Sequence, residues 1–225
     1  MGETKFRHEI KHYINTADHL ELQNRMKYIA KRDIYARDNG NYLVRSLYFD
    51  NFNDTALREK IEGVNKREKF RIRFYNYDAN FIRLEKKSKI NGMCTKVSTR
   101  ITRDQSERLI NGDYEFLRDS GDMLFLDLYS KIQYQVLRPK SIVDYQREAY
   151  VYPIGNVRVT IDYDIRTSIN INNFFDRQLL TVPVTNNIIL EIKYDEFLPQ
   201  IITDITQLNN RQRSAFSKYA VSRLI

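Results

Sequence analysis

Alternating apolar and basic residues are the feature of this sequence that most restricts its fold. Phe70, Ile72 and Phe74 alternate with Arg71 and Arg73. Successive side chains of a β-strand point to opposite faces of the sheet, so this segment predicts a strand with one apolar and one basic face. Because the alternation recurs along the chain, the sequence predicts a sheet whose polar face is dominated by arginine and lysine.

Eight segments have the period-two pattern of a strand. They lie near residues 5–14, 42–50, 66–76, 80–90, 94–101, 142–151, 156–165 and 187–194. Asn91-Gly92 predicts a hairpin between the fourth and fifth segments, since both residues tolerate a positive φ. Pro-Ile-Gly-Asn at 153–156 predicts a turn between the sixth and seventh.

Helical patterns fall between or after these strands. Thr16 can cap a helix over residues 16–31, and Thr102 with Gln105 forms a capping-box pattern for a short helix ending at Gly112. Three further helices are expected over 122–136, from Pro199 onward, and over about 211–223. We find no internal repeat and no linker, so the expectation is one domain over residues 1–225.

The basic face fits two arrangements. In the first, the apolar face packs on helices and the basic face is merely solvated. In the second, an α+β fold, the eight strands close into an antiparallel barrel with the charged face inside and helices outside. Unpaired buried charges are costly, so such an interior would hold water and an anion. Interior carboxylates, namely Glu9, Glu85, Asp162 and Glu191, would pair with the cations or hold a divalent metal ion.

The charge balance favours an anionic partner. The chain of 225 residues has 37 lysines and arginines against 29 acidic residues, a formal charge of +8. Nucleic acid, phosphorylated metabolites or an acidic membrane surface would suit that excess. Tyrosine and phenylalanine mostly share the apolar side of the strands, which disfavours a single-strand nucleic-acid binder, so no nucleic-acid partner is expected.

Several other classes of site are excluded or disfavoured. Cys94 is the only cysteine, which excludes an intrachain disulfide and a cysteine-based zinc site. His8 and His12 share the side of Phe6 and Ile10 in the first segment, which favours packing on the outer face over metal ligation. No stretch approaches the length of a transmembrane helix, and the N-terminus lacks a signal-peptide pattern, so a cytoplasmic protein is expected.

Eight short motifs occur in an order that is similar to a known family. They are Arg-His-Glu-Ile-Lys at 7–11, Ser-Leu-Tyr-Phe-Asp-Asn at 46–51, Arg-Ile-Arg at 71–73, Leu-Glu-Lys-Lys at 84–87, Tyr-Gln-Arg at 145–147, Val-Arg-Val-Thr-Ile-Asp at 157–162, Leu-Glu-Ile-Lys at 190–193 and Phe-Ser-Lys-Tyr at 216–219. No single motif is specific. Together they resemble the VTC domain, the polyphosphate-polymerising member of the CYTH-like triphosphate tunnel superfamily, over about residues 5–222.

The resemblance implies a barrel with a closing C-terminal helix, and transfer of the ATP γ-phosphoryl group to a growing polyphosphate. It assigns catalytic roles to Lys218, Arg71, Arg73 and Lys87, phosphate binding to Lys11, Lys96, Arg147, Arg158, Lys193 and Ser217, and a Mn²⁺ or Mg²⁺ ion to Glu191. Lys218 is either a phosphate anchor or a nucleophile, and Glu191 is alternatively an internal ion-pair partner. The partners implied are ATP and polyphosphate, and a membrane partner protein is compatible with the family.

Departures from the family pattern bear on the choice of reaction. Arg7 stands where related triphosphatases have a metal-binding glutamate, which favours the polymerase branch. Ala215 stands where the family often has lysine, so Arg211 or Arg213 is expected to supply that contact or the contact is missing. The alternatives are a metal-dependent triphosphatase, with water as acceptor, and a non-catalytic module that binds polyphosphate.

Overall fold

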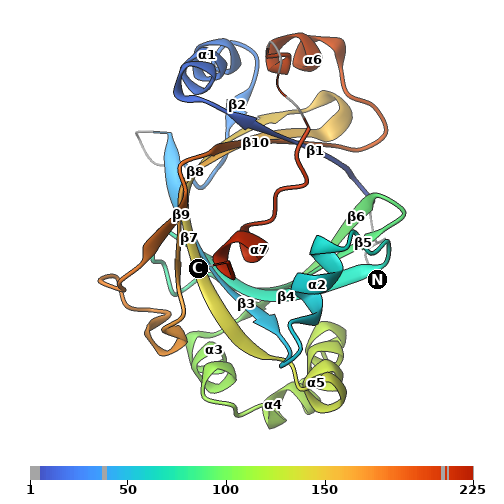
Figure 1. Cartoon of the computed structure of the whole chain (residues 1–225), viewed down its shortest axis with the longest axis vertical. Helices are drawn as coiled ribbons and strands as arrows, with labels where there is room; N and C mark the ends of the chain where they lie inside the picture. The colour runs from blue at the N-terminus through green and yellow to red at the C-terminus, as the bar shows by residue number, and fades with distance from the viewer. Residues whose placement is uncertain (1–5, 37–39, 209–210, 212, 225) are drawn as a thin grey trace.

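A single curled antiparallel sheet organises the computed structural model, which describes residues 6–36, 40–208, 211 and 213–224 (Figure 1). Along the sheet the strands follow the order β1 (His8–Ile14), β10 (Ile188–Tyr194), β8 (Val157–Ser168), β7 (Arg138–Tyr152), β3 (Asn41–Asp50), β4 (Arg67–Tyr75), β5 (Ile82–Ile90) and β6 (Met93–Ile101). Two short strands lie off this path, β2 (Lys31–Arg32) beside β7 and β9 (Val182–Thr185) beside β8.

The two ends of the sheet meet at one point. Arg7, just before β1, and Cys94, in β6, exchange backbone N–H···O hydrogen bonds of 3.0 and 3.2 Å. The expected eight-stranded antiparallel barrel is therefore confirmed along the main path. The strands β2 and β9 were missed because two and four residues are too few to show an alternating pattern.

The predicted turns are present. Asn91 and Gly92 both have positive φ between β5 and β6, and the same holds for Gly155 and Asn156 between β7 and β8. These conformations suit the tight reversal of a hairpin and are ones that glycine and asparagine adopt at low cost.

Helices cover the outer face of the curled sheet at both ends of the molecule (Figure 1). The helices of the described chain are α1 (Thr16–Met26), α2 (Thr55–Ile61), α3 (Arg103–Ile110), α4 (Glu115–Arg118), α5 (Met123–Gln135), α6 (Gln200–Thr206) and α7 (Lys218–Ser222), with 3₁₀ turns η1 (Ile154–Asn156) and η2 (Ile171–Asn173). Of these, α7 lies inside the curl (Figure 1). None of the helices in the described part of the chain is long and apolar enough to cross a membrane.

Two apolar cores lie between these helices and the sheet. In one, Leu22 of α1 and Ile202 of α6 pack against the outer residues of β1, β8 and β10. In the other, Leu109 of α3 and Leu128 of α5 pack against β3, β4 and β5. Burial of the apolar strand faces against helices leaves the opposite, polar faces directed into the curl, as the sequence predicts.

The chain returns to the inside of the curl at its C-terminal end (Figure 1). Phe216 and Tyr219 pack there against Tyr42, Tyr48 and Tyr145 from β3 and β7. These three tyrosines are exceptions to the expectation that tyrosine and phenylalanine mostly share the apolar side of the strands. Their rings pack against the inserted helix, and this contact buries them although the inner face is otherwise polar.

The C-terminal helix is much shorter than the predicted helix over 211–223. Only α7 is helical in the described part of that range, and Gln212 lies outside the described residues. Arg213 pairs with His12, and the N–H of Ser214 donates to the carbonyl of Lys11 at 2.8 Å. Ser214 therefore does not share a helical face with Lys218, because its segment extends along β1.

Smaller differences concern the other predicted elements. The helix expected over 16–31 ends at Met26, since Lys31 already belongs to β2. Two short helices, α2 and α4, were not expected. Lys5, the first residue of the first predicted strand, lies outside the described residues.

A buried charged pair lies on the outer face of the sheet between β3 and β7. Arg45 of β3 is 1% exposed and makes two hydrogen bonds with Asp144 of β7, at 2.9 and 2.7 Å. Its guanidinium also donates to the carbonyl of Phe174 at 3.1 Å. A buried arginine is tolerated when its donors are satisfied in this way, and the pair anchors the η2 segment to the sheet.

Candidate functional site

Charged side chains line the inner face of the curled sheet at alternate positions of the strands. They are Glu9 and Lys11 of β1, Lys69, Arg71 and Arg73 of β4, Glu85 and Lys87 of β5, Lys96 of β6, Arg147 of β7, Arg158 and Asp162 of β8, and Glu191 and Lys193 of β10, with Lys218 of α7. The cations outnumber the carboxylates. The inner face therefore has an excess of positive charge in surroundings that restrict water.

The first cluster joins β1, β10 and β5. Lys11 Nζ lies 3.0 Å from a carboxylate oxygen of Glu9 and 3.2 Å from one of Glu191. Lys87 Nζ lies 2.6 Å from Glu9, and Lys193 forms an ion pair with Glu191. Burial opposes ionisation of Glu9, but Lys11, Lys87 and Lys193 hold its pKa below the ordinary value. Burial lowers the pKa of Lys193 to about 8, although Glu191 and Glu9 favour its charged form.

The second cluster joins β4, β5 and β6 around Glu85. Arg71 approaches Glu85 through two nitrogens, at 2.7 and 2.6 Å, and Lys96 Nζ lies 3.2 Å away. Arg73 lies 3.9 Å from the same carboxylate and donates to the Tyr145 hydroxyl at 2.9 Å. Burial opposes ionisation of Glu85, but Arg71 and Arg73 hold its pKa well below the ordinary value. The two arginines predicted as a pair therefore point to one place.

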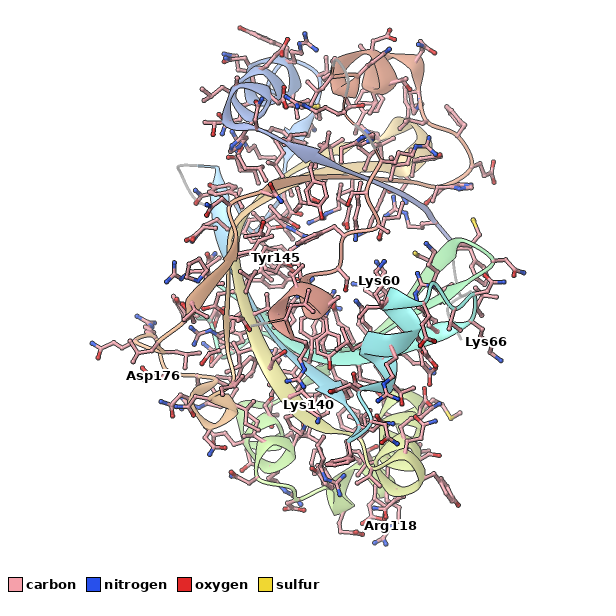
Figure 2. The ribbon with its side chains drawn as sticks, viewed as in Figure 1. Lys60, Lys66, Arg118, Lys140, Tyr145 and Asp176 are labelled. Carbon is pink, nitrogen blue, oxygen red and sulfur yellow. The ribbon has the colours of Figure 1, made fainter. Side chains whose placement is uncertain are left out.

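The third cluster joins β7, β8 and α7. Arg147 donates to both oxygens of Asp162, at 2.6 and 2.7 Å, and Lys218 also bonds to Asp162. Burial opposes ionisation of Asp162, but Arg147 and Lys218 lower its pKa to about 2. Lys218 Nζ lies 4.5 Å from the ring centroid of Tyr145, which Figure 2 labels inside the curl. Burial lowers the pKa of Lys218.

Arg158 and Ser217 lie close to these clusters and have other partners. Arg158 forms an ion pair with Asp33 and donates to the Tyr42 hydroxyl at 3.1 Å. Its register partner in β10 is Lys193. Ser217 caps α7, since its hydroxyl accepts from the N–H of Ala220 at 3.3 Å. The structure thus brings every residue of the predicted site to the inner face or to the helix inserted into it.

Lys69 also belongs to this surface, and the sequence-based prediction missed it. Its Nζ lies 3.5 Å from the Ser217 hydroxyl and 5.6 Å from the ring centroid of Tyr48. Burial lowers the pKa of Lys69 to about 7. Lys69 shares the strand parity of Arg71 and Arg73, so alternation extended by two residues would have found it.

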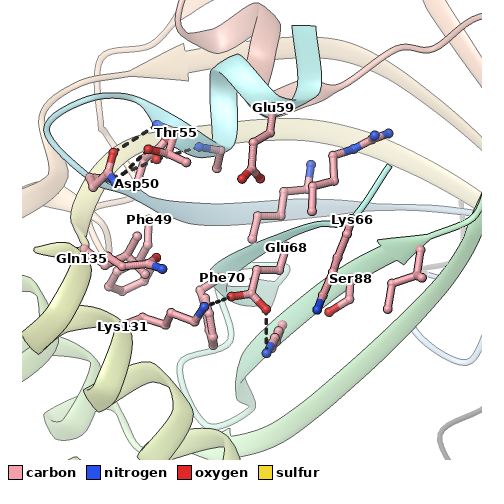
Figure 3. A pocket seen from close by; sticks show the side chains of 17 residues that line it. Phe49, Asp50, Thr55, Glu59, Lys66, Glu68, Phe70, Ser88, Lys131 and Gln135 are labelled. Carbon is pink, nitrogen blue, oxygen red and sulfur yellow. Dashed lines mark hydrogen bonds and ion pairs between the residues drawn. The ribbon is translucent and has the colours of Figure 1, made fainter. Parts of the chain in front are cut away.

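Two cavities adjoin the clusters near α2. One, of about 140 Å³, opens from the inner face beside Lys11 and Lys87. The other, of about 510 Å³, lies between α2, α5 and the outer faces of β4 and β5 (Figure 3). In the larger one Glu68 pairs with Lys131 and, at 2.8 Å, with Lys86 (Figure 3). Ion pairs neutralise more of the charge in the larger cavity, so the excess positive charge faces the smaller one.

The carboxylates near Lys11 suit a hard divalent cation. Glu9 and Glu191 both lie within ion-pair distance of Lys11, so their oxygens are close together. Among the described residues no three histidine, cysteine or acidic side chains gather as a ready metal site. Mg²⁺ and related ions are commonly held by one or two carboxylates together with substrate phosphates, and this donor set fits that mode. His8 instead stacks on Tyr194, with ring centroids 5.0 Å apart.

Arg7 is occupied outside this cluster. Its Nε lies 2.9 Å from Asp195, and its guanidinium also donates to the carbonyl of Asn156. A glutamate at this position would add a third carboxylate beside Glu9 and Glu191. Arg7 is a cation instead, and its guanidinium binds Asp195 and the carbonyl of Asn156 in η1.

Comparison with known proteins supports this architecture. A model of the VTC domain matches residues 6–225. HpAC1 from Hippeastrum, described as an adenylyl cyclase candidate with a dominant triphosphatase activity, is 16% identical over 97% of this chain and 95% of its own, with a TM-score of 0.57. The PH1819 protein from Pyrococcus horikoshii is 12% identical over 96% and 97%, with a TM-score of 0.49. No curated protein sequence matches the chain. The likeness to HpAC1 shows a shared fold.

Proposed function

This chain belongs to the VTC domain family, and on that basis we propose that it synthesises inorganic polyphosphate. The γ-phosphoryl group of ATP would be transferred to the terminal oxygen of a phosphate chain inside the curled sheet. The observation that carries this proposal is the convergence of Arg71, Arg73, Arg147 and Lys218 on one enclosed surface with fewer carboxylates than cations. A triphosphate and a second phosphate chain would supply the missing negative charge.

The proposed role of the cations is alignment and charge neutralisation. Phosphoryl transfer needs little covalent chemistry from a protein, and catalysis comes mainly from positioning and electrostatics. Lys11, Arg71, Arg73, Lys87 and Arg147 would donate charge-assisted hydrogen bonds to phosphate oxygens. Each such bond typically contributes about 1.5–3 kcal/mol. Lys96, Arg158, Lys193 and Ser217 would hold more distant phosphates.

The phosphoryl group can pass directly from ATP to the phosphate chain, so the reaction needs no nucleophile from the protein. A terminal oxygen of the chain forms a bond to the γ-phosphorus, the bond from that phosphorus to the β–γ bridging oxygen breaks, and ADP leaves. We assign Lys218 the role of a phosphate anchor. Its ion pair with Asp162 favours the charged ammonium and fixes its orientation. A free amine attacking phosphorus would first have to give up that ion pair.

The proposed metal site consists of Glu191 with Glu9. When bound there, Mn²⁺ or Mg²⁺ would withdraw charge from phosphate oxygens. Lys11 and Lys193 keep both carboxylates ionised, which is the form that a cation needs. Because Arg7 does not add a third carboxylate, the site is expected to be poor at activating water.

Product stoichiometry tests the proposed reaction against the alternative of a triphosphatase. With ATP and Mn²⁺ we expect ADP to form while little free phosphate appears early in the reaction. Parallel enzyme-coupled assays of ADP and of phosphate measure this ratio. Release of one phosphate per ADP from the start would replace the polymerase proposal with a hydrolase. Binding of ATP and polyphosphate without any ADP would indicate a binding module.

A further inference from the structure

Four cations at one mouth of the curled sheet form no ion pair with a carboxylate in the described part of the chain. They are Lys60 of α2, Arg67 and Lys69 of β4, and Lys89 of β5, and all of them border the cavity of about 140 Å³. In contrast, each cation of the three clusters forms an ion pair, as Lys11 and Lys87 do with Glu9. Unbalanced positive charge is therefore concentrated at this mouth.

The strand register places like charges directly opposite one another there. Arg67 pairs with Lys89, and Lys69 pairs with Lys87, on the same face of β4 and β5. Like charges in opposite positions of an antiparallel pair destabilise it. An anion that lies across these two pairs would relieve the repulsion, which Glu9 offsets only at Lys87.

The sheet has a gap beside the first half of β4, where the pairing with β3 has ended. The pairing of β3 with β4 stops at Tyr48 and Arg71, so the first half of β4 extends beyond β3. The helix α2 covers that part instead (Figure 3). Lys60 extends from α2 toward the space enclosed by the sheet (Figure 2). Its pKa is lowered to about 8 by burial and by Arg67 and other nearby cations.

The position of α2 is linked to that of α7. Asp50 accepts from the N–H groups of Ala56 and Leu57 at 3.0 and 3.1 Å, which holds the first turn of α2. The same carboxylate accepts from the Tyr219 hydroxyl at 2.7 Å. The helix that presents Lys60 and the helix that presents Lys218 are therefore fixed to one residue.

We propose that Lys60, Arg67, Lys69 and Lys89, named here the α2 mouth, bind the distal phosphates of a linear polyphosphate whose near end lies at the site. The inference rests on the proposed function and adds the path that the polyphosphate takes out of the site. Lys11 and Lys87 belong both to the site and to the border of the cavity, so a chain leaving the site meets the α2 mouth without interruption. Tripolyphosphate has only three phosphates, which the site itself would take up.

Chain-length-dependent binding tests this subsite. Calorimetric titrations at fixed ionic strength would compare tripolyphosphate with long-chain polyphosphate for the intact protein and for the double variant Lys60→Ala/Lys89→Ala. We expect the double variant to lose roughly tenfold or more of its affinity for the long chain and distinctly less for tripolyphosphate. Long chains gain affinity statistically from overlapping binding registers, but that gain is the same for both proteins and cancels in the comparison.

Matched variants make the result specific. Lys66→Ala removes an exposed charge beside the larger outer cavity and should leave the length dependence intact. If the double variant does not fold, the single variant Lys89→Gln replaces it in the titrations, and its thermal unfolding midpoint shows whether it is folded. Equal losses for both ligands, or no loss for either, would refute the subsite. If length-dependent binding persists in a protein that forms no polymer, the α2 mouth stands and the proposed synthesis fails.

Discussion

Replacing Lys218 by alanine is expected to reduce polymer formation by about 100-fold or more while ATP affinity falls by less than about tenfold. Several other cations would still hold the nucleotide. Lys218 approaches the site from the inserted helix α7 and bonds to Asp162. Asp162 keeps its pairing with Arg147 when Lys218 is removed, so the barrel should remain intact. Initial rates of polymer formation and equilibrium titration with ATP would measure the two quantities.

Two control variants define what Lys218 does. Lys27→Ala removes one positive charge from the exposed end of α1 and should change neither quantity. Lys218→Arg keeps the charge, so an anchor should retain part of its activity, whereas a nucleophilic amine would be lost. Equal losses of ATP binding and rate in Lys218→Ala would contradict a role specific to transfer.

Replacing Glu191 by glutamine is expected to abolish metal-dependent turnover, with a loss of about 100-fold or more. The side chain is nearly isosteric, and Lys11 and Lys193 keep ion pairs with Glu9 at 3.0 and 3.7 Å. The fold should therefore persist. Turnover as a function of Mn²⁺ concentration gives the first readout. Mn²⁺ binding in the presence of tripolyphosphate, measured by electron paramagnetic resonance, gives one that is independent of activity.

A second buried carboxylate separates metal binding from ion pairing. Glu148 accepts from His19 and Gln23 on the side of the barrel that packs on α1. Glu148→Gln should affect stability without weakening Mn²⁺ binding. If Glu191→Gln bound Mn²⁺ as tightly as the unchanged protein and turned over normally, Glu191 would be an internal ion-pair partner only.

The strand pattern was sufficient to predict which residues share the basic face, and the barrel expected from the family resemblance put that face inside. Because side chains alternate strictly along a strand, Arg71 and Arg73 had to share a face that Phe70 and Ile72 do not. The same reasoning placed Glu191 and Lys193 together, and the structure has both pairs as expected. The ion-pair partners were not predictable in this way, since they depend on which strands become neighbours.

Other features depend on contacts distant in the sequence. Arg45 occupies the apolar parity of β3 and is accommodated because Asp144 on the adjacent strand and the carbonyl of Phe174 accept its hydrogen bonds. The range 211–223 has helix-forming residues, yet Ser214 bonds to the backbone of β1 instead. Lys60 is on a short helix of seven residues that was not predicted, so the sequence did not indicate that it would border the cavity.

The most direct measurement of the proposed activity is the size of the product made from ATP labelled at the γ-phosphate, incubated with the protein and Mn²⁺ and separated on a polyacrylamide gel. The proposed function predicts a ladder of labelled phosphate chains longer than triphosphate, which is lost in the variant Arg71→Ala/Arg73→Ala. Label found only in orthophosphate would contradict polyphosphate synthesis and assign the charged interior to hydrolysis.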